Sequence, residues 1–525
     1  MKLKSIFSIN NIAVLGFGLP TLILSLSLSF SDESLMVLGV LLLVLNGSIL
    51  LLRQFVYIST LFRFSNVIAA STLLATSLGT LIAYTTDTWE VTLSRLGVVD
   101  DPIIALTESL IYVNLCCFVF FALDIFLKPS NRFSLITIDS LILQKIRYRL
   151  DQIIFPLLGL AFIISIIQAY LIVSGRYGFI GAGRTDRAES GLKFVNPEVE
   201  LALLLVPLGF LILGIITLKF RQLSKSDVKF IAVFMYGFTI LVEFSWLFSV
   251  SSRSAFGFSS LLFLFGMRIS TFSLKSFTND DRADSINQDN QFSTRKIIIV
   301  FTSILLFIYL GVSITSFSRF LANKAPSFKE DSFQERLSFV SEQLYSYYIT
   351  GDSIFEKDEF ESKLDQNLKT RGFVITGLIA IYNDEDYYPL LGEDIFYSSM
   401  KAIPGVIFPG KYVFPSQEGL YNQRYSLTGV RDIADSFYLS SFVDFYWFGS
   451  ILYPLIMFTI LNIYLKLINR QSRSIFGLIL LVSILFSYSL SGGEGTMIGF
   501  FVMLRNGIIL FILFELIPYI RKLKK

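Results

Sequence analysis

Apolar runs of about 20 residues recur along the whole chain, and they constrain its fold more than any other feature. Each run is long enough to cross a hydrocarbon core of about 30 Å as a helix. The chain is 53% hydrophobic and only 16% charged, whereas a soluble protein of this length carries roughly a quarter charged residues. We therefore predict an all-α, polytopic integral membrane protein.

The apolar runs predict twelve transmembrane helices. They cover residues 11–30, 34–52, 66–84, 106–127, 152–174, 199–218, 230–250, 255–274, 297–316, 443–465, 476–490 and 496–517. The N-terminus is basic like that of a signal peptide, but its apolar stretch is long for one and no small-x-small cleavage site follows. We therefore expect a retained first span.

Lysine and arginine are unevenly distributed between the loops, and this bias orients the spans. The N-terminal MKLK, the C-terminal RKLKK and alternate loops between them are net basic, except for loop 275–296, where acidic residues cancel the bases. The intervening loops include the acidic stretches SDES and TTDTWEVTLSRLGVVDD. Because cytoplasmic loops carry the excess of positive charge, both termini are expected in the cytoplasm.

The same parity places residues 317–442 outside the cytoplasm, and their composition shifts to charged and aromatic residues. Within this segment, Phe333, Leu337, Val340 and Leu344 recur at helical spacing. We expect a mostly helical extracytosolic cap between the ninth and tenth spans. The predicted organisation is a bundle of spans 1–9 at 1–316, the cap at 317–442, and a bundle of spans 10–12 at 443–525.

A loop predicted to lie outside, residues 174–198, carries Arg176, Arg184 and Arg187 near Gly175, Gly178, Gly181 and Gly183. Outer loops usually contain few arginines. Guanidinium groups match phosphate oxygens with paired hydrogen bonds, and glycine allows the backbone to approach a ligand closely. One interpretation is a diphosphate clamp at the outer interface. The other is pairing with acidic residues of the same loop or with lipid headgroups.

Three ionisable residues lie within or beside predicted spans. The hairpin SSRSA is so short that Arg253 is expected at the outer surface, and Glu243 lies at least two turns below it in the seventh span. An ionisable residue at this depth faces the bundle interior by default, where it either holds an arginine or takes part in catalysis. Arg505, near the middle of the last span, costs about 2.5–3.5 kcal/mol to insert, so it should have a buried partner or line a wet cavity.

The end of the cap combines positive charge with aromatic rings, and three prolines hold it extended. Such a mixture suits sugars, which stack on rings and hydrogen-bond through their hydroxyls. The alternative is an irregular loop that tyrosines pin to the membrane. The residues concerned are Lys411, Arg424 and Arg431, then Tyr421 and Tyr425, and finally Asp435 and Asp444, which lead into the tenth span.

Several kinds of site are disfavoured by composition. The chain has no histidine, which removes the commonest general base and any histidine-based metal site. Cys116 and Cys117 are adjacent in an apolar run and are expected to be small buried hydrophobic residues. We expect no metal and no cofactor. The net charge of +3 is divided among loops and gives no indication of a nucleic-acid partner.

With these features, the chain resembles the Wzy-type oligosaccharide repeat-unit polymerases, the O-antigen and capsular polysaccharide polymerase family. The likeness lies in a many-span bundle with one large outer loop late in the chain, in the SRSA hairpin, and in AIPGVIFPGKY followed by SFVDFYWFGSILYPLIM. The chain departs from the family at Gly405, where an arginine is common, and at Tyr412, which replaces a proline.

The resemblance implies a glycosyltransferase at the outer face of the bacterial cytoplasmic membrane. Such an enzyme transfers a growing glycan from an undecaprenyl diphosphate carrier to the end sugar of a new lipid-linked repeat, without a metal. The partners it implies are undecaprenyl-diphosphate-linked glycans and membrane lipids, with a chain-length regulator as a further candidate.

The chemistry of this transfer assigns roles to the charged residues. Arg176 and Arg253 would stabilise the diphosphate leaving group. The acceptor hydroxyl needs a base, for which Asp435, Asp444, Glu243 and Glu494 compete, unless an arginine-assisted attack needs none. The expected substrate-binding residues are Arg184, Arg187, Lys411, Arg424, Arg431, Tyr421 and Tyr425.

Two other functions would share much of this layout. A glycan ligase characteristically uses a histidine in the outer loop, and this chain has none. A lipid-linked oligosaccharide flippase would line a central cavity with cations and would not need so large a cap.

Overall fold

The fold of this chain was obtained as a computed structural model. It describes residues 12–58, 61–86, 89, 102–126, 137–174, 208–219, 229–250, 253–271, 333–346, 374–382, 384, 387–405, 407–415, 417–425, 436–471, 474–492 and 495–516. Within these ranges the regular structure is helical and contains no strand, which confirms the predicted all-α class.

Eight helices in the described part of the chain are long and apolar enough to cross a membrane. They are Ile12–Phe30, Glu33–Val56, Phe64–Thr85, Ile103–Phe126, Gln152–Val173, Lys229–Trp246, Phe437–Arg470 and Met497–Phe514. Shorter apolar helices lie where the sixth and eleventh spans were predicted, at Leu208–Lys219 and Ile475–Ser491, and the 19-residue helix Arg253–Thr271 lies where the eighth was predicted. The chain is a polytopic helical membrane protein. The predicted ninth span, 297–316, lies outside the described residues, so the count of twelve and the side of each loop stay predictions.

The chain divides into two compact units. The first consists of Met1–Ile142, Asn367–Leu481 and Leu485–Lys525, and the second of Leu143–Gln366 and Val482–Ile484. The predicted domain boundaries at 316 and 442 follow from membrane topology, and they stay predictions.

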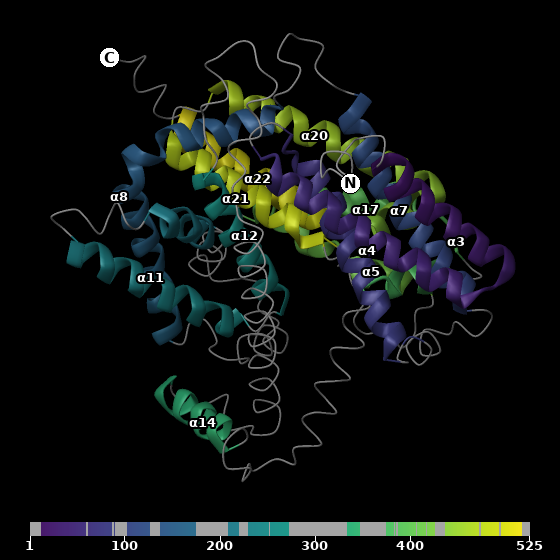
Figure 1. Ribbon diagram of the computed structural model, residues 1–525, viewed down its shortest axis with the longest axis horizontal. Coiled ribbons are helices and arrows are strands. Elements are labelled where there is room, and N and C mark those ends of the chain that lie inside the picture. Colours follow the sequence, from purple (N-terminus) through teal and green to yellow (C-terminus); the bar gives the residue numbers. More distant parts are fainter. Residues whose placement is uncertain are drawn as a thin grey trace, which may run out of the picture. The chain divides into compact units, whose positions relative to one another are not determined.

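The first unit begins with four helices that pack in sequence. They are α3 (Leu19–Phe30), which follows the short π-helix η1 (Ile12–Gly18), then α4 (Glu33–Val56), α5 (Phe64–Thr85) and α7 (Pro102–Phe126). α7 also packs against α20 (Gly449–Gln471), so an early and a late helix of the chain lie in one bundle (Figure 1). Small residues permit the close contacts: Gly39 faces Leu24, and Gly47 faces the backbone of Ala70.

α5 is enclosed by protein, although its composition is unusually polar for a span. Its buried residues include Ser65, Asn66, Thr72, Thr76, Ser77 and Thr80. Hydroxyl groups of such residues return hydrogen bonds to the preceding turn, as Thr76 Oγ1 does to Thr72 O at 2.8 Å. Ser71 Oγ donates instead to Ser489 O in α21 (Ile475–Ser491), at 2.6 Å. A lipid-facing helix of this composition would be poorly anchored, so its polarity marks α5 as the centre of the bundle.

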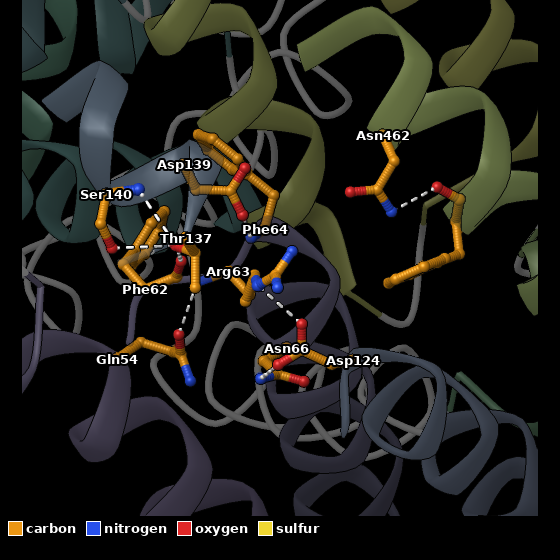
Figure 2. A network of polar contacts seen from close by, with 11 residues as sticks. Gln54, Phe62, Arg63, Phe64, Asn66, Asp124, Thr137, Asp139, Ser140 and Asn462 are labelled. Atoms are coloured by element: carbon orange, nitrogen blue, oxygen red, sulfur yellow. Dashed lines mark hydrogen bonds and ion pairs between the residues drawn. The ribbon is translucent and has the colours of Figure 1, made fainter. Parts of the chain in front are cut away.

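A buried polar network holds the turn between α4 and α5 (Figure 2). Arg63 Nε forms an ion pair with Asp124 Oδ1 at 2.7 Å, and the Arg63 backbone N–H donates to Gln54 Oε1 at 2.8 Å. The Phe64 N–H donates to Asp139 Oδ2 at 3.2 Å, at the start of α8 (Ile138–Val173). Burial raises the pKa of Asp139 to about 7, although the Arg63 charge opposes this shift. The network satisfies the first backbone donors of α5.

The second unit contains most of α8, the helix Leu208–Lys219, α11 (Lys229–Val250), α12 (Arg253–Thr271) and α14 (Phe333–Tyr345). The helix Leu208–Lys219 and α12 cross with their backbones in contact, because a Cβ on Gly214 would overlap Phe263 O and one on Gly266 would overlap Leu211 O. α14 lies where the spacing of Phe333, Leu337 and Val340 predicts a helix.

The described end of the predicted cap packs into the first unit. Its elements are α16 (Thr376–Tyr382), α17 (Glu393–Ala402), the 3₁₀ helix η6 (Pro409–Val413), α18 (Gln417–Arg424), α19 (Phe437–Phe445) and η7 (Tyr446–Phe448). α16 packs against α7 and α19, and α17 packs against α19 and α22 (Met497–Phe511). The chain turns between α19 and α20 at Tyr446, whose φ of 53° is unusual for a residue with a Cβ.

Replacing Gly449 should disrupt this turn. A Cβ at Gly449 would overlap Ser441 O and would lie 2.9 Å from Tyr112 Oη. We expect Gly449→Ala to lower the free energy of unfolding by about 1–3 kcal/mol, the usual effect of overpacking. Gly159→Ala is the control, because a Cβ there meets nothing within 4 Å. Thermal unfolding in detergent measures both variants, and equal melting temperatures would contradict the described turn.

Candidate functional site

The predicted site residues fall into three groups. Arg176, Arg184, Arg187, Arg431 and Asp435 lie outside the described residues. Arg253 begins α12, and its side chain is outside the description. Glu243 lies in the second unit, whereas Lys411, Tyr421, Arg424, Tyr425 and Asp444 lie together in the first unit, between α17 and α20.

Asp444 caps the N-terminus of α17 from a position 50 residues further along the chain. Its carboxylate accepts the N–H of Asp394 at 3.0 Å and the N–H of Ile395 at 3.1 Å. It also accepts the hydroxyl of Tyr453 at 2.5 Å. Gly392, which precedes α17 with a φ of 95°, has no side chain that could do this. A carboxylate satisfies the exposed N–H groups and complements the positive end of the helix dipole.

The backbone of the same turn is also tied to α17. The N–H of Leu390 donates to Val443 O, and the N–H of Leu391 donates to Asp444 O, both at 2.9 Å. Asp444 therefore contacts the segment before α17 through its carbonyl group and α17 itself through its carboxylate. These contacts account for its complete burial without a catalytic role. Its proposed role as a general base stays a prediction.

Asp394 is a second buried carboxylate, which the sequence reasoning missed. It accepts hydrogen bonds from Gln417 Nε2 and Tyr421 Oη, each at 3.0 Å. Burial raises its pKa to about 6, Ser440 and Tyr421 oppose this rise by hydrogen bonding, and the Asp444 charge adds to it. The sequence signal was a Gly-Glu-Asp run at the start of a helix, where acidic residues are favoured.

Both tyrosines predicted to bind sugar are buried in protein. Tyr421 belongs to the Asp394 network, and Tyr425 Oη donates to Tyr388 O at 2.9 Å. The ring of Tyr425 stacks on Tyr387, with centroids 5.8 Å apart and an interplanar angle of 16°. The rings of Tyr421 and Tyr425 therefore pack inside the cap segment and do not face solvent. The more exposed rings of this region are Tyr388, Phe396, Tyr446 and Phe448.

Two cations meet the C-terminal end of α17. Arg505 Nη1, on α22, donates to Ala402 O at 3.0 Å, and Lys411 Nζ, in η6, donates to Ile403 O at 3.1 Å. The sequence predicted a buried partner for Arg505, and the carbonyl of Ala402 is that partner. These consecutive carbonyls lie at the negative end of the helix dipole, where cations are favourable. α17 thus has a carboxylate at its N-terminus and two cations at its C-terminus.

Arg424 forms a paired contact with Glu393, with Nη2 at 2.8 and 3.0 Å from the two carboxylate oxygens. The arginine side chain is 42% exposed, so this ion pair contributes little to stability. It leaves Arg424 at the surface of α18, where its charge also interacts with the half-exposed Tyr388.

Glu243 in α11 is fully buried, and its neighbour is an amide. Gln168 Nε2, on α8, lies 3.5 Å from Glu243 Oε2. Among the residues described, no group of three or more His, Cys, Asp and Glu could hold a metal ion. Cys116 and Cys117 are free and buried, as predicted.

Comparison with known proteins gives no assignment: no protein-family model, no curated protein and no solved structure matches this chain.

Removing the Asp444 carboxylate should loosen α17. Asp444→Ala leaves two buried N–H groups and the Tyr453 hydroxyl without an acceptor, and each such group costs about 1–3 kcal/mol. We expect a loss of several kcal/mol, and a smaller loss for Asp444→Asn, which keeps one acceptor oxygen. Asp32→Ala is a matched control, because Asp32 caps α4 locally and such caps contribute about 1 kcal/mol. An Asp444→Ala protein that melts like the control would contradict the remote cap.

The stability of the first unit should fall as the pH rises through about 6. The folded-state pKa of Asp394 is raised from 3.8, so its contribution is fully present below 3.8 and is lost as the pH rises through about 6. A rise from 3.8 to about 6 corresponds to roughly 3 kcal/mol at most. Asp394→Asn removes this titration and leaves that of Asp139, so its melting temperature should change less than that of the wild type between pH 5 and 8. If the melting temperatures of the wild type and of Asp394→Asn depended on pH in the same way, Asp394 would not be the titrating group.

Proposed function

We propose that this protein polymerises undecaprenyl-diphosphate-linked oligosaccharide repeat units into a surface polysaccharide, as the resemblance to the Wzy-type polymerases implies. The observation that carries the proposal is that two cations, Arg505 and Lys411, both contact the C-terminal end of α17. One cation comes from a predicted span and the other from the predicted cap, so the positive site joins these two parts of the chain.

A diphosphate leaving group needs such a site. Negative charge develops on its bridging oxygen as the glycosidic bond breaks, and fixed cations stabilise that charge. A guanidinium group binds phosphate oxygens through paired hydrogen bonds, whereas an ammonium group acts as a compact charge. Arg505 and Lys411 are held by carbonyl groups that differ by one residue, so their positions are fixed before any ligand binds.

The proposal keeps the outer arginines and adds Arg505 to them. Arg176, Arg184, Arg187 and Arg253 remain the predicted members of the diphosphate clamp. Lys411 was predicted to bind substrate, and its contact with α17 supports a fixed position for it. Of the four carboxylates considered as bases, Asp444 has a structural role in the described fold, which favours the other three in this proposal.

The glycan would lie over the more exposed rings of the cap segment rather than over Tyr421 and Tyr425. Tyr388, Phe396, Tyr446 and Phe448 present aromatic surface in the same segment that carries Lys411 and Arg424. Sugar rings stack their apolar faces on such surfaces. In this proposal the site faces the outside of the bacterial cytoplasmic membrane, with both termini in the cytoplasm and lipid tails between the spans.

Neutralising either cation should impair chain extension. Arg505→Gln and Lys411→Gln remove the charge but keep a side-chain donor for the α17 carbonyls. Loss of one preorganised donor in a transition state lowers turnover on the order of a hundredfold. Arg505→Lys keeps the charge and should retain more activity than Arg505→Gln. The assay incubates purified protein with lipid-linked repeats, without added metal, and measures the ladder of products.

Lys466→Gln is the control for this experiment. Lys466 lies in the later part of α20, well along the helix from the α17 contacts, and its removal should leave the ladder unchanged. Wild-type ladders from both Arg505→Gln and Lys411→Gln would remove the proposed site. A flippase would give no ladder with the wild-type protein, because it moves single repeats without joining them.

A further inference from the structure

The second unit contains an acidic side chain buried in the middle of a candidate span. Glu243 lies in α11, within the apolar helix Lys229–Trp246, and is fully inaccessible to solvent. Gln168 of α8, also fully buried, is its hydrogen-bonding neighbour, with Nε2 3.5 Å from Glu243 Oε2. This pair connects two spans through polar groups in an otherwise apolar contact.

A third helix closes the site around Glu243. A Cβ on Gly209, in the helix Leu208–Lys219, would overlap Oε1 and Cδ of Glu243. Only glycine therefore leaves space for the carboxyl group, and Glu243 Oε1 lies against the Gly209 backbone. Contact of this kind excludes water from that oxygen. The carboxyl group is enclosed by three helices.

The described parts of these helices offer no cation to Glu243. Lys219 and Lys229 stand at the ends of their helices, roughly 15 Å from Gly209 and roughly 21 Å from Glu243 along the helix axes. On α12, Arg268 Nη1 donates to Thr271, and the side chain of Arg253 lies outside the description.

α8 also carries Asp139, Lys145, Arg147, Arg149 and Asp151, but all of them stand in its first turns, roughly 25 Å or more from Gln168 along the helix axis. The titratable groups nearer to Glu243 on the described parts of these helices are phenols. Tyr236 Oη is bonded to Thr217 at 2.7 Å, and Tyr170 is 55% exposed. An isolated carboxylate in such surroundings is far less favourable than the neutral acid.

The hydrogen bonds around Glu243 also point to a protonated carboxyl group. Among the residues that the structure describes, Glu243 Oε1 and Gln168 Oε1 are both buried without a hydrogen-bond partner. Both are acceptors, so an ionised Glu243 cannot satisfy Gln168 Oε1. A carboxylic acid provides the missing donor, and the orientation of an amide can be exchanged by a flip. A proton on Glu243 Oε2, with the amide flipped, would make the acid the donor and the Gln168 oxygen the acceptor of their hydrogen bond.

We propose that Glu243 is a proton-binding site within the membrane, which carries its proton at neutral pH and shares an acid–amide hydrogen bond with Gln168. The bond joins α8 to α11, and Gly209 provides the space for it. This role differs from a general base and from an arginine partner, and it does not rest on the proposed polymerase activity. Loss of the proton would leave a charge between apolar helices and break the bond that joins them.

A lipid-soluble carbodiimide tests the proposal. N,N′-dicyclohexylcarbodiimide reacts with protonated carboxyl groups in apolar surroundings: the acid adds across the reagent and rearranges to a stable N-acylurea, so the whole reagent is retained. The full-length protein in lipid vesicles is treated at pH 6 to 9, digested and analysed by mass spectrometry. We expect the adduct at Glu243, with a yield that falls as the pH rises. Glu393, ion-paired with Arg424 near the surface, is the internal control and should stay unmodified.

Two substitutions test the same idea through stability. Glu243→Gln replaces the neutral acid with an amide of similar shape and should keep the melting temperature within a degree or two of wild type. Glu243→Leu removes the partner of Gln168 and should lower it by several degrees. An unmodified Glu243 at every pH would overturn the proposal, as would a Glu243→Gln protein that melts as low as Glu243→Leu.

Discussion

The carboxylate of Asp444 accepts two backbone N–H groups of α17, and the arrangement of the candidate site depends on this contact. A ten-residue helix has little stability of its own, because too few hydrogen bonds offset the cost of ordering it. α17 is held from outside, by Asp444 at its N-terminus and by Arg505 and Lys411 at its C-terminus. Each external group neutralises the end of the helix dipole that it touches. The site is therefore a helix whose position is set by charges on other segments.

The same principle explains where polar residues lie in this bundle. Groups that would be costly in lipid are turned towards protein and are paired there. Arg63 meets Asp124 at one turn. On α5 the hydroxyl groups of Thr76 and Thr80 bond to the preceding turn, while that of Ser71 bonds to α21. Glu243 follows a different route, because its described neighbour is an amide rather than a cation. A buried charge can be compensated by an opposite charge, as Asp124 is by Arg63, or an acid can be neutralised by a proton, as we propose for Glu243.

Periodicity and local chemistry predicted part of this structure. The all-α class and most spans follow from the length of the apolar runs. The burial of Glu243 and a buried partner for Arg505 were also predicted. The packing of α17 could not be, because its partners lie about 50 and 100 residues further along and no local pattern encodes them. For the same reason Tyr421 and Tyr425 read as exposed aromatic faces, although Asp394 and Tyr388 hold them inside.

Two partners of α17, Asp444 and Arg505, follow it in the sequence, so α17 can reach its final packing only after they have been synthesised. Chain synthesis runs from the N-terminus, so the ribosome releases the residues of α17 before it has made α20 or α22. Asp444 and Arg505 come later, and the latter belongs to the last described helix. Until that helix is inserted, the short segment has neither its acidic cap nor its arginine. Completion of the candidate site is thereby tied to the insertion of α22, and a nascent or truncated chain without α22 lacks the contact of Arg505 with Ala402.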